Sequence, residues 1–136
     1  MKYNKEVSIK DFSFHHTINT RFRDVDAFHH VNNAVFLSYF EDAGKTFIDR
    51  WQVNLSDKSL IVASVKIDYK QQLKHPSEVI IGQKVSRLGT TSFDVFAVMF
   101  LGKKQVSSAI TTIVCYDFNL NKSIPLFEEI KKDFNV

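Results

Sequence analysis

Hydrophobic and polar residues alternate early in the chain and later follow a helical spacing. Residues 12–23 have a period of two, which predicts a half-buried strand. Its apolar face would carry Phe12, Phe14, His16, Ile18, Thr20 and Phe22. From Asn33 to Trp51 the apolar positions recur every three or four residues, which predicts a buried helix capped by Asn32 or Asn33. The apolar stripe of this helix would consist of Phe36, Phe40, Ala43, Phe47, Ile48 and Trp51.

The rest of the chain is predicted to form strands. Alternating segments at 60–70, 78–88, 92–101 and 104–117 are separated by turn residues, and a short helix is expected at 125–134, with Pro125 near its first position. One face of the 60–70 strand would carry Ile61, Ala63, Val65, Ile67 and Tyr69. This order predicts a single α+β domain over residues 1–136, with an antiparallel sheet of about five strands wrapped around one long central helix. A second copy of the chain would cover the remaining apolar surface.

Composition narrows the class of protein. Thirteen phenylalanines among 136 residues need a large core, an interface or an apolar ligand to cover them. One cysteine excludes an intramolecular disulfide and multi-cysteine zinc motifs. The formal charge of +3 is scattered, so no nucleic-acid partner is expected. A charged N-terminus and the lack of a long apolar run predict a cytoplasmic protein with no membrane partner.

The chemistry-bearing residues gather between the first strand and the helix. This short connection contains Asp24, Asp26, His29, His30, Asn32 and Asn33. The free N–H groups of a helix N-terminus suit a developing oxyanion, and a nearby aspartate suits a general base or nucleophile for acyl transfer. A purely structural role is also open for each residue. Asp24 is expected to pair with Arg21 or Arg23, Asp26 could form an Asx turn, and His30 could be structural. No metal site is expected, because adjacent histidines in an extended chain point in opposite directions.

The run RDVDAFHHVNNAVFLSYFEDA at residues 23–43 resembles the signature of hotdog-fold acyl-CoA thioesterases of the 4-hydroxybenzoyl-CoA thioesterase-like group. The resemblance implies that Asp26 is the catalytic carboxylate and that His30 orients it or binds substrate. It also implies that the backbone N–H at Asn33 polarises the thioester carbonyl. The sequence departs from the pattern at His29, where the family often has glycine. Phe28 stands where plant acyl-carrier-protein thioesterases have asparagine, so a mechanism based on that residue does not transfer.

The resulting prediction is a homodimeric or homotetrameric enzyme that hydrolyses acyl-CoA and needs no cofactor beyond the coenzyme A of its substrate. His29, Val31, Lys66 and Lys70 are expected to contact substrate, the lysines through the coenzyme A phosphates. Glu41 would pair with Lys45 or, if that face of the helix meets the pocket, would supply a second carboxylate. Two alternatives stay open: an acyl-carrier-protein thioesterase, and a non-catalytic acyl-CoA or lipid-binding hotdog module.

Overall fold

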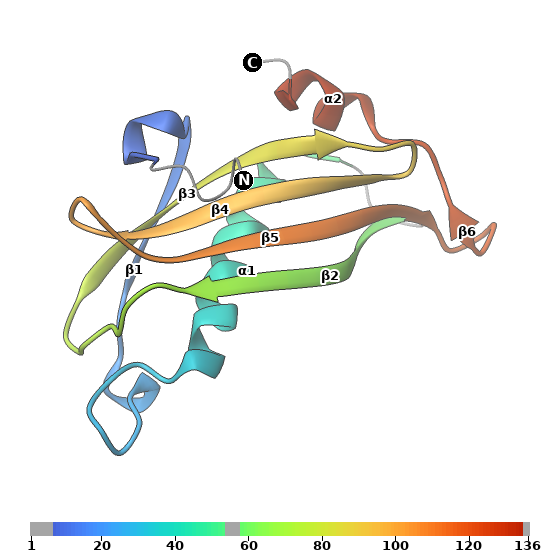
Figure 1. The fold of residues 1–136 in the computed structure, drawn as a ribbon. Coiled ribbons are helices and arrows are strands. Elements are labelled where there is room, and N and C mark those ends of the chain that lie inside the picture. The colour runs from blue at the N-terminus through green and yellow to red at the C-terminus, as the bar shows by residue number, and fades with distance from the viewer. Residues whose placement is uncertain (1–6, 54–57, 135–136) are drawn as a thin grey trace.

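The computed structural model describes residues 7–53 and 58–134. One sheet curves past a long helix (Figure 1). The main elements in chain order are β1 (Phe14–Asn19), α1 (Asn33–Asp49), β2 (Lys58–Tyr69), β3 (Glu78–Leu88), β4 (Ser92–Leu101), β5 (Lys104–Asp117), β6 (Lys122–Ser123) and α2 (Glu128–Phe134). The strands lie in the order β1-β3-β4-β5-β2, every neighbouring pair is antiparallel, and β6 pairs with β5. The predicted α+β architecture is confirmed.

The first strand is shorter than its alternation predicts. β1 pairs with β3 from Phe14 to Asn19, and the ladder stops where β3 begins at Glu78. The next residues form a 3-10 turn at Phe22–Asp24, so Phe22 is 81% exposed and its assignment to the apolar face is wrong. The two strands are antiparallel, so beyond Asn19 the chain passes the first residue of β3 and has no further ladder partner in that strand.

The long helix packs its apolar stripe against the sheet. Phe36, Phe40, Ala43 and Phe47 are buried as predicted. They contact helix-facing residues of β3 and β4 in two core clusters. The helix ends at Asp49 rather than Trp51. The second helix begins at Glu128, so Pro125 precedes it and is not its first residue.

A bulge changes which side chains of β2 face the helix. The register with β5 shifts between Val62 and Ser64, which leaves Ala63 as the extra residue. Leu60 and Ile67 therefore both pack against the core, and the prediction that Ile61 shares a face with Ile67 is wrong. β2 also forms one edge of the sheet. The bulge and the edge position together leave apolar side chains of β2 partly exposed.

The outer face of the sheet has its own aromatic cluster. Phe12 packs there with Phe96, Val98 and Phe100, and its ring lies directly over Gly82. β4 is therefore buried on both faces, which makes it the centre of the fold. Within the described ranges, no helix is long and apolar enough to cross a membrane.

Candidate active site

The connection between β1 and α1 folds into a small hairpin. The Asn32 N–H donates to the Asp24 carbonyl over 2.9 Å, and the Asp26 N–H donates to the His30 carbonyl over 2.8 Å. Val25 and Val31 form an antiparallel bridge between these two pairs. The Val31 N–H also donates to the Leu73 carbonyl over 2.7 Å. The loop is therefore fixed by backbone bonds and returns to the start of α1.

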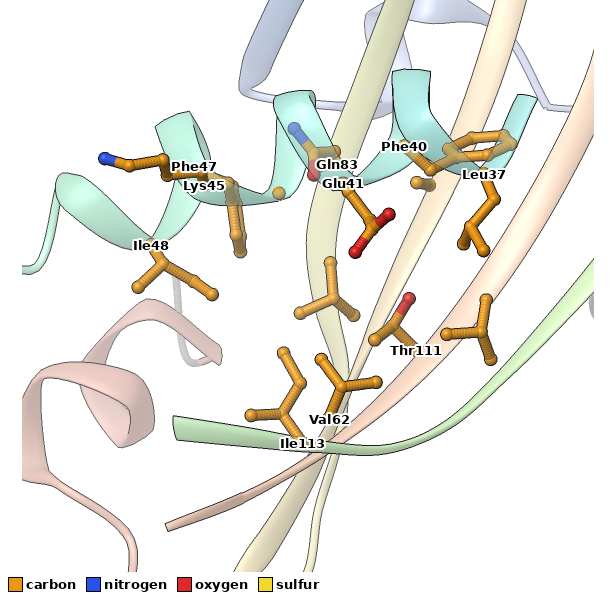
Figure 2. Close-up of a pocket in the computed structure, with 14 residues that line it drawn as sticks. Leu37, Phe40, Glu41, Lys45, Phe47, Ile48, Val62, Gln83, Thr111 and Ile113 are labelled. Carbon is orange, nitrogen blue, oxygen red and sulfur yellow. The ribbon is translucent and has the colours of Figure 1, made fainter. Parts of the chain in front are cut away.

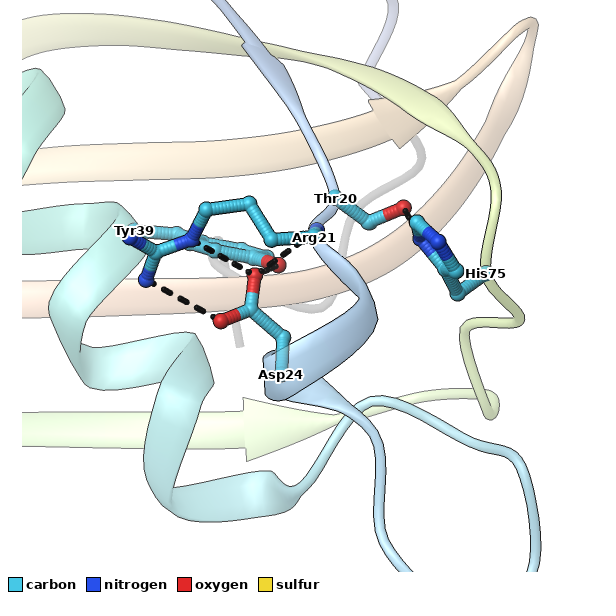
Figure 3. A network of polar contacts seen from close by, with 5 residues as sticks. All are labelled: Thr20, Arg21, Asp24, Tyr39 and His75. Carbon is cyan, nitrogen blue, oxygen red and sulfur yellow. Dashed lines mark hydrogen bonds and ion pairs between the residues drawn. The ribbon is translucent and has the colours of Figure 1, made fainter.

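Asp24 holds the base of this hairpin (Figure 3). Its carboxylate is 2% exposed, and it accepts hydrogen bonds from the Tyr39 hydroxyl, the Arg21 backbone N–H and the Arg21 guanidinium. Burial would raise the pKa of Asp24, but the bonds from Tyr39 and Arg21 outweigh burial and hold it below its ordinary value. Burial and the bond to Asp24 raise the pKa of Tyr39. The predicted ion pair with Arg21 is confirmed, and these donors give Asp24 a structural role.

Asp26 sits at the turn of the hairpin. Its Oδ1 accepts from the Phe28 N–H at 2.9 Å and from the His30 N–H at 3.4 Å, so the Asx turn left open by the sequence is formed. Oδ2 makes no hydrogen bond to the part of the chain that the structure describes. The contact between Asp26 and His30 runs through the backbone of His30, whose ring has no hydrogen-bond partner among the described residues.

The N-terminus of α1 offers one backbone donor. Asn32 is the cap: its side-chain oxygen accepts from the Ala34 N–H at 2.9 Å and its carbonyl accepts from the Val35 N–H at 2.8 Å. The Asn33 N–H, the first of the helix, has no acceptor within residues 7–53 and 58–134. The Tyr69 hydroxyl donates to the Asn33 carbonyl over 3.0 Å and ties the end of β2 to this turn. A free N–H at the positive end of the helix dipole can stabilise an oxyanion.

The remaining sequence-predicted residues lie in different surroundings. His29 is exposed, and its backbone adopts the left-handed conformation, with φ of 67°. Val31 is 3% exposed and packs in the core, so its side chain is not on an open surface. Lys66 on β2 and Lys70 directly after its end are both exposed, and strand alternation puts Lys66 on the face opposite Tyr69. The structure therefore brings Asp26, His30 and Asn33 into one loop, and the lysines belong to a neighbouring surface.

An apolar cavity of about 160 Å³ lies beside the helix, between α1 and strands β2, β3, β4 and β5 (Figure 2). Glu41, Gln83 and Thr111 are polar residues in its wall. Lys45 pairs with Asp49 over 2.9 Å, so the predicted pair with Glu41 is wrong and Glu41 faces the pocket. Most of the lining is apolar: Leu37, Phe40, Phe47, Ile48, Val62, Val65, Val95, Ala97 and Ile113.

Sequence reasoning missed Gln83 and Tyr39. Gln83 had a usable signal, because it is a polar residue between the core residues Ile81 and Val85 on the helix-facing side of β3. Tyr39 had none, because its hydroxyl meets Asp24 only through the fold. Among the described residues, no group of three or more His, Cys, Asp or Glu side chains could hold a metal ion.

Comparison with known proteins places this geometry among enzymes. The family model for the thioesterase-like superfamily matches residues 20–134. The long-chain acyl-CoA thioesterase FadM of Escherichia coli is 26% identical over 121 residues, which cover 85% of this chain and 92% of FadM. The uncharacterized protein YsmA of Bacillus subtilis is 31% identical over 83 residues, covering 60% of this chain and 56% of YsmA. The crystal structure of a Thermus thermophilus thioesterase complexed with coenzyme A and Zn superposes with a TM-score of 0.80 at 26% identity, covering 92% of this chain and 99% of that one.

Proposed function

The chain belongs to the thioesterase-like superfamily, and from this premise we propose that it hydrolyses an acyl-CoA thioester to the free acid and coenzyme A. FadM and the coenzyme A complex of the Thermus thermophilus thioesterase support this substrate class. Neither an acyl-carrier-protein substrate nor a purely binding role has a comparable observation in its favour.

The observation that carries the proposal is the free Asn33 N–H at the start of α1, next to the hairpin that bears Asp26. The thioester carbonyl oxygen would accept from this N–H as negative charge develops on it. Asp26 would then either remove a proton from an attacking water or attack the carbonyl carbon itself. In either route the carbon–sulfur bond breaks, coenzyme A leaves as a thiolate that takes up a proton, and water supplies the second oxygen of the acid. His30 would orient Asp26 or contact the substrate.

The test is Asp26→Asn, assayed by release of free thiol from a panel of acyl-CoA substrates. We expect kcat to fall by about 10²-fold or more, the scale of a missing general base, while the fold is unchanged. Asp42→Asn is the matched control, because Asp42 lies on the exposed face of α1. Wild-type kcat in Asp26→Asn would overturn the assignment. Binding of acyl-CoA by the wild-type protein without hydrolysis would favour the non-catalytic module.

We further propose that a second copy pairs along β2 and that the two chains share the site. In support, β2 is an edge strand of twelve residues, and Val62 and Tyr69 on it are 54% and 46% exposed. Long apolar edges are normally covered. In such a dimer Lys66 and Lys70 would reach the phosphates of coenzyme A.

Subunit mixing tests the shared site. Asp26→Asn would be mixed with a variant carrying Lys66→Glu and Lys70→Glu, and subunit exchange followed separately. Partial return of activity is expected, because some mixed dimers receive one site with both halves intact. Proven exchange without recovery, or a fully active monomer in sedimentation, would refute sharing, and sedimentation would also separate a dimer from a tetramer.

A further inference from the structure

One buried amide in the cavity wall has an acceptor without a partner. Gln83 is 1% exposed, and its Nε2 donates to the Ala43 carbonyl of α1 over 2.9 Å. This bond fixes the orientation of the amide, so Oε1 points away from that carbonyl and into the cavity (Figure 2). Oε1 makes no hydrogen bond within the described part of the chain. Among the described residues no fully buried side-chain nitrogen or oxygen lacks a partner, so Oε1 is reached through the cavity. An apolar ligand that excluded water from Oε1 would leave this acceptor unpaired at a cost, which a ligand that donates to it avoids.

Two further polar groups meet the same space. The Glu41 carboxylate extends from α1 between the helix and the strands, with Thr111 of β5 on the facing wall (Figure 2). Neither side chain has a hydrogen-bond or ion-pair partner within residues 7–53 and 58–134. Lys45 does not neutralise Glu41, because its ammonium bonds to Asp49. Two acceptors and one hydroxyl in an apolar wall match a ligand group that both donates and accepts, which is a hydroxyl.

Gly44 lines the same cavity at a position where the backbone does not require glycine. Glycine in a helix interior lowers stability relative to alanine. Here a Cβ would meet nothing within 4 Å, and Gly44 does not have the positive φ that would require glycine. Gly44 lines the cavity next to Glu41 and Lys45. The residue therefore keeps open a space that the described side chains do not fill.

The position of Glu41 along α1 indicates which part of a substrate it could contact. Glu41 lies eight residues after Asn33, roughly 12 Å along the helix axis, and Gly44 roughly 16 Å. Glu41 cannot touch a carbonyl held at the Asn33 N–H of its own chain, but an acyl chain extending from that carbonyl can reach it. We propose that the cavity holds the acyl group and that Glu41, Gln83 and Thr111 bind a hydroxyl on it, so the preferred substrate is a hydroxylated acyl thioester. This specificity rests on the proposed thioester hydrolysis.

The experiment compares dodecanoyl-CoA with hydroxydodecanoyl-CoA thioesters whose hydroxyl is moved along the chain. We expect kcat/KM for the best hydroxylated thioester to exceed that for dodecanoyl-CoA by about tenfold or more. This is the factor that corresponds to one hydrogen bond that dodecanoyl-CoA cannot make. Thr111→Val and Glu41→Met should reduce this ratio to near one. Glu129→Met is the matched control, because Glu129 is exposed on α2, does not line the cavity and should leave the ratio unchanged. The ratio is taken within each variant, so a partial loss of folded protein cancels.

Calorimetric titration of the free dodecanoic and hydroxydodecanoic acids measures their affinities, and so tests the same preference without catalysis. A wild-type ratio near one, or a ratio that Thr111→Val and Glu41→Met do not change, would overturn the hydroxyl subsite. If no thioester is cleaved but the hydroxylated acid binds more tightly and Thr111→Val removes that difference, the proposed hydrolysis is wrong and the subsite stands. Equal binding of both acids would refute the subsite.

Discussion

Removal of the Tyr39 hydroxyl should destabilise the fold out of proportion to its size. Tyr39→Phe deletes one donor to the Asp24 carboxylate, which is 2% exposed and would keep only its bonds from Arg21. Hydrogen bonds to charged groups contribute about 1.5–3 kcal/mol. Since Arg21 still compensates the charge, we expect a loss near 2 kcal/mol at neutral pH, at the lower end of that range. For a chain of this size the loss corresponds to a fall in Tm of roughly 7 °C.

The pH dependence separates this mechanism from a simple packing defect. The pKa of Asp24 lies below its ordinary value in the folded chain, because the Tyr39 and Arg21 bonds outweigh burial. The stability that these bonds contribute is therefore present above the pKa of an unfolded aspartate and is lost as the pH falls through the folded pKa. The difference between wild type and Tyr39→Phe should be full at neutral pH and should shrink on acidification.

The assay is urea unfolding at one fixed protein concentration, repeated across this pH range. Tyr116→Phe is the control: within the described residues the Tyr116 hydroxyl has no hydrogen-bond partner, so its removal should change stability by less than about 0.5 kcal/mol. A Tyr39→Phe protein as stable as Tyr116→Phe at neutral pH would refute the reasoning. So would a loss of stability that does not change with pH.

Three other substitutions probe the loop, the cavity and the lysines. His29→Val should lower stability by about 1–2 kcal/mol and His29→Gly should not, because His29 has φ of 67°; equal unfolding curves for all three proteins would contradict this. Gly44→Ala should raise stability by about 0.5–1 kcal/mol and lower kcat/KM for long acyl substrates, and a loss of stability would show that the space is already filled. Lys66→Ala or Lys70→Ala should raise KM more than it lowers kcat, and the rise in KM should become smaller as the salt concentration increases. A rise in KM that salt does not change would count against contact with the phosphates.

The sequence predicted the layout of the fold because its periodicities are strong. The family, the hotdog fold, the five main strands and the central helix are confirmed. The errors lie where strand pairing, rather than the local sequence pattern, decides where a strand ends or which way its side chains face. β1 ends where β3 begins, which exposes Phe22, and a one-residue bulge at Ala63 changes the inward face of β2. A period of two cannot reveal a bulge, because both registers fit the same apolar run.

The sequence predicted where the candidate site lies in the chain, but not which side chains contact one another in it. The motif placed Asp26, His30 and Asn33 in one loop, and the cap at Asn32 was among the two residues expected. Their catalytic roles stay predictions. The partners that distinguish the two aspartates come from distant segments. Tyr39 reaches Asp24 from the second turn of α1, and the Oδ2 of Asp26 has no partner among the described residues. The sequence predicted the ion pair of Asp24 with Arg21 but not the bond from Tyr39.

Three residues that break local rules lie in the two candidate regions of the molecule. His29 is a non-glycine residue with positive φ, Gly44 interrupts a helix, and Gln83 places an amide on a core face. Natural sequences accept such conflicts mainly at functional sites. His29 belongs to the hairpin that leads to the free Asn33 N–H, whereas Gly44 and Gln83 line the cavity beside α1. An oxyanion donor and an apolar cavity on the same helix suit a substrate with a reactive carbonyl and a long acyl group. The same local conflicts therefore support both the proposed hydrolysis and the proposed position of the acyl chain.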